Sequence, residues 1–366
     1  MEIEGFLKKI LEAHENKLPF TVFRYPESKK VFAYVQDDAS LFLTQDFEGS
    51  GFVMAPFDSS EDAVIFPKEK SDQFNCSFND QDLFFDESSS SFDTSVQSRD
   101  KKYYLELVRK AIARIHAGEC QKIVVSRSVD IEIKKLDIAD LLKKMMFKYP
   151  SAFVYIWYHP EIGMWAGATP ETLLNTDGRN FKTMSLAGTQ KYEGNINVEW
   201  GVKEIEEQKI VTRHIEDELS DFSISSGKTY TVKAGNLVHL CNDIVGTFEE
   251  KIQLKELIDR LHPTSAVCGL PRSKAMGFIR SEENHKRRFY TGFLGEINQR
   301  KIVSHEQKGI DGVFSRLFVN LRCMKLAQGE SIKATLFMGG GITGQSDPDS
   351  EWSETLQKSL VMKSVL

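Results

Sequence analysis

The chain has 366 residues, enough for one large elaborated domain or for two or three smaller ones. Hydrophobic residues make up 41% and charged residues 27% of the sequence, which is typical of a folded globular protein and excludes a disordered, fibrous or membrane-embedded chain. A formal net charge of -6 provides no field that would attract phosphate backbones, so a nucleic-acid partner is not expected.

The N-terminal residues 1–20 do not read as a targeting signal, because charged side chains interrupt their apolar positions. No later segment approaches the roughly 18 consecutive apolar residues that span a bilayer. Short strands with polar turns are predicted over residues 21–43 and 51–66, too little material for an independent catalytic domain. A polar break at 86–99, with serine at positions 88–91, is typical of a solvated loop or linker.

The break suggests an N-terminal β-rich segment, residues 1–99, that packs on a main body, residues 100–366. In the main body, apolar residues at helical spacing predict helices over 104–115, ending at Gly118, and over 198–219. The Asp347-Pro348 pair has the cap-plus-proline form that opens a last helix. β-branched and aromatic runs predict further strands over residues 122–131, 152–158, 313–326 and 332–337. This mixture favours an α+β fold.

Within the predicted strand 313–326, Leu317, Val319 and Cys323 share one face, which would place Arg322 on the opposite face. The five cysteines of the chain are odd in number, scattered and free of CxxC spacing, so neither a disulfide framework nor a zinc cluster is predicted. A reducing, cytoplasmic environment fits this pattern.

Two acidic helix faces are candidate cation sites. Glu351, Glu354 and Lys358 are three and four residues apart on the last predicted helix, and a second group, Glu204 to Glu207, lies on the helix predicted over 198–219. Either face fits a solvated surface with an exposed ion pair equally well by spacing alone. The alternative is a site for a hard cation, since magnesium takes one or two carboxylates together with water and substrate oxygens.

Three consecutive glycines, Gly339, Gly340 and Gly341, follow a predicted strand and allow close approach of an anion to the backbone, although a tight turn would explain them equally well. They match neither the dinucleotide-binding nor the Walker pattern, and the chain has no HExxH or GxSxG motif.

Read in chain order, a series of blocks from Tyr104 to the C-terminus resembles the chorismate-utilising family, which includes anthranilate synthase large components and aminodeoxychorismate, salicylate and isochorismate synthases. The blocks are Lys122–Arg127, Ala168–Leu174, Leu186–Thr189, Leu261–Thr264 with Ala266 and Gly269, Phe289–Gly292, Val319–Cys323, Gly339–Ile342 and Glu351–Thr355. The resemblance implies an α/β sandwich, a core of large antiparallel sheets with helices outside.

The activity implied is that of the family's isochorismate synthases: water adds at ring carbon 2 of chorismate while the hydroxyl at carbon 4 leaves. One group must take a proton and another must give one. By motif position these are Lys122, which must be neutral to act as the base, and Glu171, which must keep its proton to act as the acid. His239 matches a further active-site histidine of the family. The product would feed menaquinone, siderophore or salicylate synthesis.

Ligand-binding residues are also implied by motif position. Mg²⁺ would be held by Glu207 and Glu354, with Glu204 and Glu351 as helpers, and would bind the ring carboxylate. Arg322 would take the enolpyruvyl carboxylate bidentately. The remaining substrate-binding positions are Gly188, Ala266, Tyr290, Gly339, Gly340, Gly341 and Lys358.

Within the family, the resemblance favours water over ammonia as the nucleophile because Lys122 is present, so neither an amidotransferase subunit nor an oligomer is expected. Ala187 stands where aminodeoxychorismate synthases carry a nucleophilic lysine, and Ala266 where salicylate synthases tend to carry threonine. Gln208 departs from the family's KExxEH pattern at the histidine, and residues 301–312 match no family hairpin. A salicylate synthase and a catalytically silent chorismate-binding protein are the alternatives.

Overall fold

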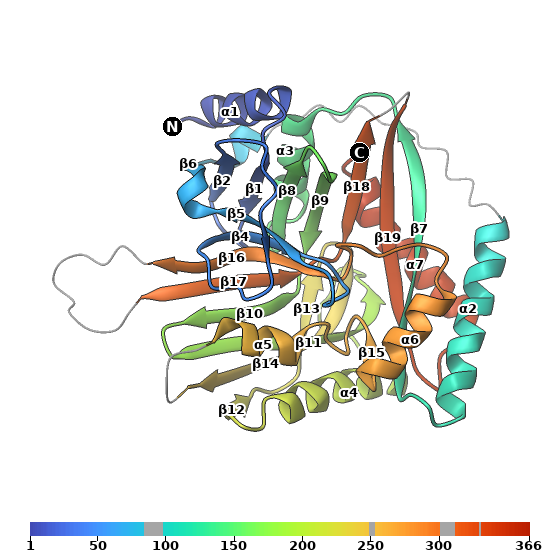
Figure 1. Ribbon diagram of the computed structural model, residues 1–366. Coiled ribbons are helices and arrows are strands. Elements are labelled where there is room, and N and C mark those ends of the chain that lie inside the picture. Colours follow the sequence, from blue (N-terminus) through green and yellow to red (C-terminus); the bar gives the residue numbers. More distant parts are fainter. Residues whose placement is uncertain (84–97, 249–252, 301–311, 329–330) are drawn as a thin grey trace.

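The computed structural model describes residues 1–83, 98–248, 253–300, 312–328 and 331–366, and consists of two large antiparallel sheets that pack face to face with helices outside (Figure 1). The predicted α+β fold is confirmed. The strands of the two sheets run in clearly different directions in Figure 1. Among the described helices, none is both long and apolar enough to cross a membrane.

The nine-stranded sheet is assembled from three distant parts of the sequence. The paired strands β7 and β19 carry residues of the predicted site, with Gly339 opposite Ser126 and Gly341 opposite Val124. Its strands, in spatial order, are β15 (Gly269–Leu270), β7 (Lys122–Ile133), β19 (Ile332–Ile342), β18 (Cys323–Gln328), β9 (Gly163–Thr169), β8 (Phe153–His159), β1 (Phe20–Arg24), β2 (Lys30–Gln36) and β6 (Ser71–Ser77).

The ten-stranded sheet is similarly mixed in sequence, and its strand β13 (Tyr230–Ala234) pairs only with β14. The other strands, in spatial order, are β12 (Ser223–Ser226), β14 (Leu237–Thr247), β11 (Asn180–Lys191), β10 (Thr172–Asp177), β17 (Val313–Val319), β16 (Phe293–Arg300), β4 (Gly51–Ala55), β5 (Ala63–Pro67) and β3 (Leu43–Thr44). Because β1 pairs with β8 and β4 pairs with β16, residues 20–77 contribute strands to both sheets.

The helices cover the outer faces of the sheets with their apolar sides. Helices α1 (Ile3–Glu15) and α3 (Ile138–Lys148) pack on the nine-stranded sheet, and α4 (Val202–Glu218) and α5 (Leu254–Leu261) pack on the ten-stranded sheet. Helices α2 (Ser98–His116), α6 (Arg272–Glu282) and α7 (Pro348–Lys363) surround β7 and β19. Two short 3-10 helices, η1 (Lys68–Lys70) and η2 (Asp80–Leu83), complete the described elements.

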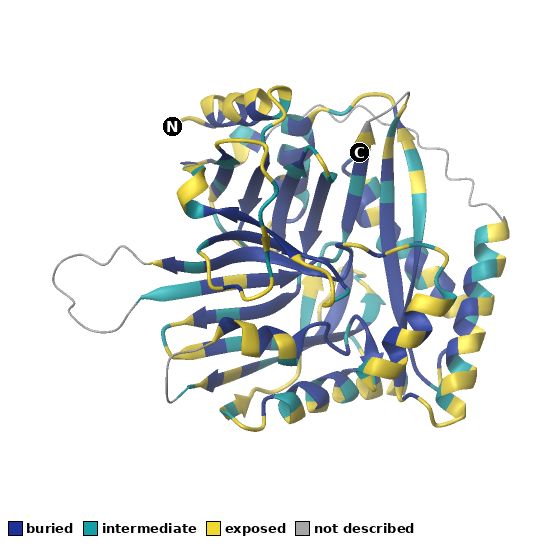
Figure 2. Ribbon diagram, in the orientation of Figure 1, coloured by how far each residue is buried: buried dark blue, intermediate teal, exposed yellow. Residues whose placement is uncertain are grey.

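Aromatic side chains fill the space between the sheets. The strands of both sheets are largely dark blue, that is buried, in Figure 2. The rings of Phe153 on β8 and Phe318 on β17 stack across the interface with centroids 4.1 Å apart. Trp165 on β9 stacks on Phe337 of β19 at 5.4 Å. Such large rings bury much apolar area and hold the two sheets at a fixed separation.

Most predicted helices and strands occur close to their expected positions. The last helix begins after Asp347, whose carboxylate accepts a hydrogen bond from the Ser350 backbone N–H as an N-cap. Helix α4 starts at Val202, four residues later than predicted, and α1 was not predicted at all. The serine run at 88–91 and most of residues 301–312 lie outside the described residues, so the division at residue 99 stays a prediction.

Two predictions about the C-terminal strands are wrong. The single strand over 313–326 is two strands, β17 and β18, in different sheets, because the chain turns at 320–322 to pass from one sheet to the other. Arg322 therefore lies in this turn, with a left-handed φ of 48°, and not on a strand face. The glycines 339–341 do not form a turn either, since β19 continues through them to Ile342.

Candidate active site

One cavity, lined by elements of both sheets and by helices α4 and α7, brings together most of the predicted site residues. The predicted residues that line it are Glu171, Gly188, Glu207, His239, Ala266, Tyr290, Arg322, Gly339, Gly340, Gly341, Glu354 and Lys358. They lie in seven or more separate segments of the chain, so only the tertiary fold places them around one space.

The three glycines of β19 give charged side chains access to the strand. A Cβ atom on Gly341 would lie 2.1 Å from Oε1 of Glu207 and 2.8 Å from Cε of Lys122. A Cβ atom on Gly340 would lie 2.8 Å from Oε2 of Glu351. Any larger residue would displace these groups, so the glycines are required by close approach of side chains, with backbone angles that do not call for glycine.

Three lysine–glutamate pairs surround this strand. Lys122 Nζ, fully buried, lies 3.0 Å from Glu207 Oε1, as an ion pair without the directional geometry of a hydrogen bond. Lys358 pairs with Glu354 at 2.5 Å and donates a hydrogen bond to the Gly339 carbonyl at 2.8 Å. The third pair joins Lys203 on α4 to Glu351 on α7 at 2.5 Å. Each pair therefore compensates a charge that burial alone would disfavour.

Glu351 is the most deeply buried of these carboxylates, at 1% exposure. Its Oε1 accepts hydrogen bonds from Lys203 and Ser346, but its Oε2 forms none with a described residue. Burial first, and then the charge of Glu354, raise the pKa of Glu351. The solvated-surface alternative for this helix face is thus wrong: the face points into the protein beside β19.

The acidic group on α4 divides between the interior and the surface. Glu207 is buried, Glu204 is half-buried with its Cβ against the position of a Gly188 Cβ, and Glu206 is exposed. Gln208, which stands where the family pattern has histidine, points to β11 and donates hydrogen bonds to the Ser185 carbonyl and hydroxyl oxygens. It anchors the helix to the sheet on the side away from the exposed Glu206.

Glu171 lies between β9 and β10, is 2% exposed, and lines the cavity. Burial raises its pKa to about 8, although the charges of Lys122, Arg322 and Lys358 act in the opposite direction. A carboxyl group with this pKa keeps its proton at neutral pH and can donate it.

Arg322 and His239 form one unit in the cavity wall. The guanidinium Nη2 donates to His239 Nε2 at 3.1 Å, so Nε2 must carry the lone pair. On the other side of the ring, Nδ1 lies 3.0 Å from the Gly188 carbonyl oxygen, which can only accept, so Nδ1 carries the proton. Arg322 Nη1 is buried and has no hydrogen-bond partner among the described residues.

Comparison with known proteins assigns the chain to a family. The model for "Chorismate binding enzyme" matches residues 57–366, most of the chain. The chain belongs to the chorismate binding enzyme family.

Curated relatives include the isochorismate synthase MenF of Bacillus subtilis (strain 168), 27% identical over 292 residues, and the isochorismate synthase EntC of Escherichia coli (strain K12), 27% identical over 272 residues. The matches cover 74% and 71% of this chain and 57% and 66% of the relatives. The crystal structure of the putative 2,3-dihydroxybenzoate-specific isochorismate synthase DhbC from Bacillus anthracis covers 98% of both chains with a TM-score of 0.77. At 20% identity this likeness shows the fold alone.

The sequence did not single out Lys203, although it is the first residue of the segment that resembles the family's KExxEH pattern. Burial would lower the pKa of Lys203, but the charges of Glu351, Glu354 and Glu207 outweigh burial and raise it. Thr189, Thr291, Leu321 and Phe337 also line the cavity. None of the four was singled out from the sequence, although Thr189, Thr291 and Leu321 lie within blocks that carry the family resemblance.

The His239 geometry predicts that the ring stays neutral, as the Nδ1–H tautomer, throughout the pH range from 5 to 8. Burial, followed by the charges of Arg322 and Lys358, lowers the pKa of His239 to about 3. Nitrogen-15 NMR of the histidine rings, with His239→Gln to assign the signal, should show no titration of His239 in this range. A protonation midpoint between pH 6 and 7 would contradict the tautomer and the hydrogen bond from Arg322.

Proposed function

We propose that the chain is an isochorismate synthase, which adds water at ring carbon 2 of chorismate and expels the hydroxyl group at carbon 4. The observation that carries the proposal is a buried carboxyl group, Glu171, in the wall of the cavity and a buried lysine, Lys122, that does not itself line the cavity but pairs with the lining residue Glu207. Lys122 is 0% and Glu171 2% exposed. The reaction needs one group of each kind, since one proton is taken and one is given.

Glu171 suits the role of the acid because its pKa of about 8 keeps it protonated at neutral pH. Proton transfer from Glu171 to the hydroxyl at carbon 4 would let that hydroxyl leave as water. Lys122, the first residue of β7, would take a proton from the attacking water in its neutral form. Its amine lies 3.0 Å from Glu207, and Glu207 lines the cavity.

Arg322 suits the role of carboxylate receptor. Its Nη1 is buried without a partner among the described residues, and an unsatisfied buried donor is costly unless a ligand completes it. His239 fixes the other end of the guanidinium through Nη2, which leaves Nη1 for an anion. The enolpyruvyl carboxylate of chorismate would supply that acceptor, and Lys358 adds positive charge nearby.

We also propose that Mg²⁺ binds at this cavity, with Glu207 and Glu354 as ligands and Glu204 and Glu351 as helpers. Among the described residues, no three acidic, histidine or cysteine side chains are grouped closely enough to hold a metal on their own. Magnesium commonly keeps several waters and substrate oxygens, so few protein ligands suffice. The buried Glu351 Oε2 without a partner fits a cation nearby. Held by these residues, a magnesium ion would supply positive charge that binds the ring carboxylate of chorismate.

Two positions support isochorismate as the final product. Ala266 lines the cavity, and Ala187 on β11 also lines it, so neither brings a hydroxyl or an amine to the substrate. A lysine at 187 would be needed for the covalent route of aminodeoxychorismate synthases, and threonine at 266 is the position that the resemblance associates with pyruvate elimination. Because water is the nucleophile, the proposed enzyme needs no amidotransferase subunit, and we propose that it acts as a monomer.

The first test is product analysis. With chorismate and Mg²⁺ the chain should form isochorismate, without salicylate and pyruvate and without anthranilate when ammonium is added; excess chelator should stop turnover. Glu207→Gln should weaken Mg²⁺ binding measured by calorimetry, whereas Glu206→Gln, an exposed neighbour on the same helix, should not. Full turnover in excess chelator would contradict the magnesium proposal, and salicylate as the product would identify the chain as a salicylate synthase instead.

The second test separates the two proton transfers. Lys122→Ala and Glu171→Gln should each lower kcat by a factor of about 10² to 10⁴ while chorismate still binds, and the double variant should be little worse than either. Because the protonated form of Glu171 is the active one and its pKa is about 8, kcat/KM of the unaltered chain should fall as the pH rises through this value. Retained turnover in Lys122→Ala would place the base elsewhere.

The third test concerns Arg322. Arg322→Lys keeps the charge and the backbone demands of the turn but loses the planar fork, so we expect a loss of about 1.5 to 3 kcal/mol in transition-state stabilisation from kcat/KM. Arg316→Lys, an exposed position on β17 in the same stretch of chain, is the control and should change kcat/KM little. An unchanged kcat/KM in Arg322→Lys would remove Arg322 from the substrate site.

A further inference from the structure

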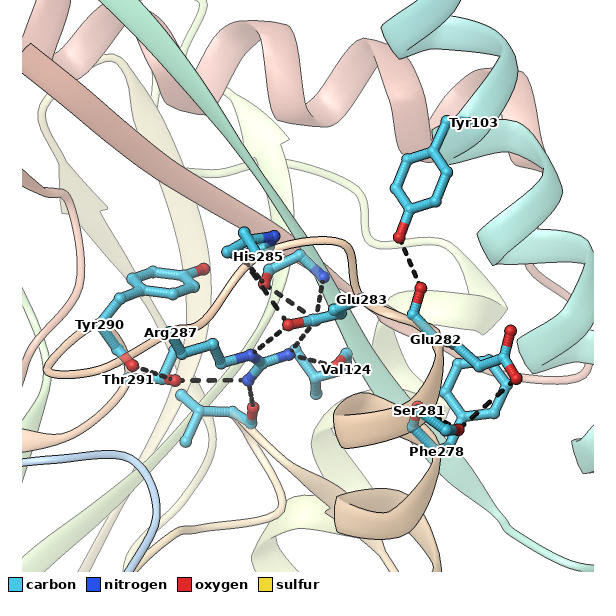
Figure 3. Close-up of polar contacts among 12 residues, drawn as sticks. Tyr103, Val124, Phe278, Ser281, Glu282, Glu283, His285, Arg287, Tyr290 and Thr291 are labelled. Carbon is cyan, nitrogen blue, oxygen red and sulfur yellow. Dashed lines mark hydrogen bonds and ion pairs between the residues drawn. The ribbon is translucent and has the colours of Figure 1, made fainter. Parts of the chain in front are cut away.

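A further buried ion pair, Glu283 with Arg287, lies behind the cavity wall, and the proposed reaction assigns it no role (Figure 3). Glu283 directly follows helix α6, where its backbone N–H caps the helix by donating to the Ile279 carbonyl. The side chains of Glu283 and Arg287 are only 1% and 2% exposed. Arg287 holds Glu283 with two hydrogen bonds, from Nε at 2.9 Å and from Nη2 at 2.5 Å.

The guanidinium of Arg287 reaches three separate segments of the cavity wall. Its Nη2 donates to the Val124 carbonyl at 2.8 Å, and its Nη1 donates to the Val267 carbonyl at 2.9 Å and to the Thr291 hydroxyl at 3.3 Å. Together with the two bonds to Glu283, these use all five N–H donors of the side chain. Val124, Val267 and Thr291 all line the cavity. Figure 3 shows Arg287 between Glu283, Val124 and Thr291.

Glu283 extends the same contact along β7. Its Oε1 accepts from the backbone N–H of Ser126 at 2.7 Å and from the Ser126 hydroxyl at 2.9 Å. The pair is therefore hydrogen-bonded to β7 at Val124 and Ser126. Both lie on the strand face that carries Lys122, since side chains two residues apart point the same way. A shift of this contact would move the amine of Lys122 relative to the opposite wall.

Thr291 makes the third segment sensitive to this contact. It has a left-handed φ of 62°, which is strained for a β-branched residue and persists only when its surroundings hold it. Its hydroxyl accepts from Arg287 and donates to the Tyr290 carbonyl at 2.6 Å. Its backbone N–H donates to the carbonyl of Asn320, in the turn that carries Arg322. Through Thr291, Arg287 thus helps to fix the positions of Tyr290 and of the turn at residues 320–322.

We propose that Glu283 and Arg287 are positioning residues that fix β7, and with it Lys122, against the Ala266–Val267 and Tyr290–Thr291 walls of the cavity. The inference rests on the proposed function for its catalytic consequence. A buried ion pair is not by itself a reason for stability, because replacing both partners by apolar groups often leaves stability unchanged or higher. What an apolar pair cannot supply is a rigid fork that bonds three wall segments at once.

Two variants separate positioning from simple charge compensation. Arg287→Lys keeps the positive charge beside Glu283 but loses the planar fork of the guanidinium. The double variant Glu283→Gln with Arg287→Met removes both charges, so that neither is left buried without a partner. Glu282→Gln is the matched control, because Glu282 directly precedes Glu283 in the chain. Its ion pair with Lys110, at 2.8 Å, lies on the surface away from the cavity.

Three measurements are made on the full-length chain. Denaturant unfolding should show the double variant folded and close to the parent in stability. Hydrogen exchange with mass spectrometry should show faster exchange in peptides covering residues 122–126, 264–268 and 289–292 in both variants and not in Glu282→Gln. With chorismate, kcat should fall by a factor of about 10 to 100, while KM changes much less because Arg322 and Lys358 are intact.

The proposal is overturned if Arg287→Lys keeps the parent kcat and exchange rates, which would reduce the pair to charge compensation. The proposal is also overturned if the double variant has the kcat and the exchange rates of the parent chain. A parent chain that makes no isochorismate would instead refute the proposed function. The exchange measurement still decides whether the pair fixes the cavity wall in that case, since it needs no turnover.

Discussion

The site depends on the cost of removing charge from water. An ionised side chain in a protein interior is tolerated only when an opposite charge or several hydrogen bonds replace its hydration. The site meets this requirement with three lysine–glutamate pairs, one between β7 and α4, one between α4 and α7 and one within α7, and with the neutral His239 ring beside Arg322. Glu171 meets it differently, because burial raises its pKa until the group holds its proton. The protonated state of Glu171 and the neutral state of His239 thus follow from the same burial that closes the site, since burial raises the pKa of Glu171 and lowers the pKa of His239.

The glycines of β19, at positions 339–341, make this arrangement possible. Positions 340 and 341 of β19 point to opposite faces of the sheet, and a Cβ at position 340 would lie 2.8 Å from Glu351 Oε2 while one at position 341 would lie 2.1 Å from Glu207 Oε1. With no side chains there, Glu351 of α7 and Glu207 of α4 approach the strand, and Glu207 pairs with Lys122 of the neighbouring β7. The glycines therefore leave space for side chains, and the tight turn that was the alternative explanation for them is not formed.

The pairs also connect stability to the proposed reaction. The carboxylates that compensate Lys122 and Lys358 are those proposed to hold magnesium, so binding of cation and substrate would exchange one set of partners for another within a fixed frame. A frame that stays in place during this exchange lowers the reorganisation needed for reaction. The aromatic layer between the sheets, and the bonds of Arg287 to three wall segments, provide such a frame from outside the cavity.

The sequence by itself determined the fold class, the helices α2, α4 and α7, the strands β7, β8 and β19, and the positions of the charged residues of the site, whereas α3, α5, α6 and the strands from β9 to β16 were not predicted. These features depend on local periodicity, on caps such as Asp347 and on ordered motifs, all of which are written in the chain. The tertiary structure alone decided which acidic face is buried, since solvated and buried carboxylates have the same helical spacing. It also decided that residues 320–322 form a turn between sheets, and that Lys203 and Arg287 bond to the site. Such contacts join residues far apart in sequence, and no local pattern specifies which distant groups will meet when two sheets pack.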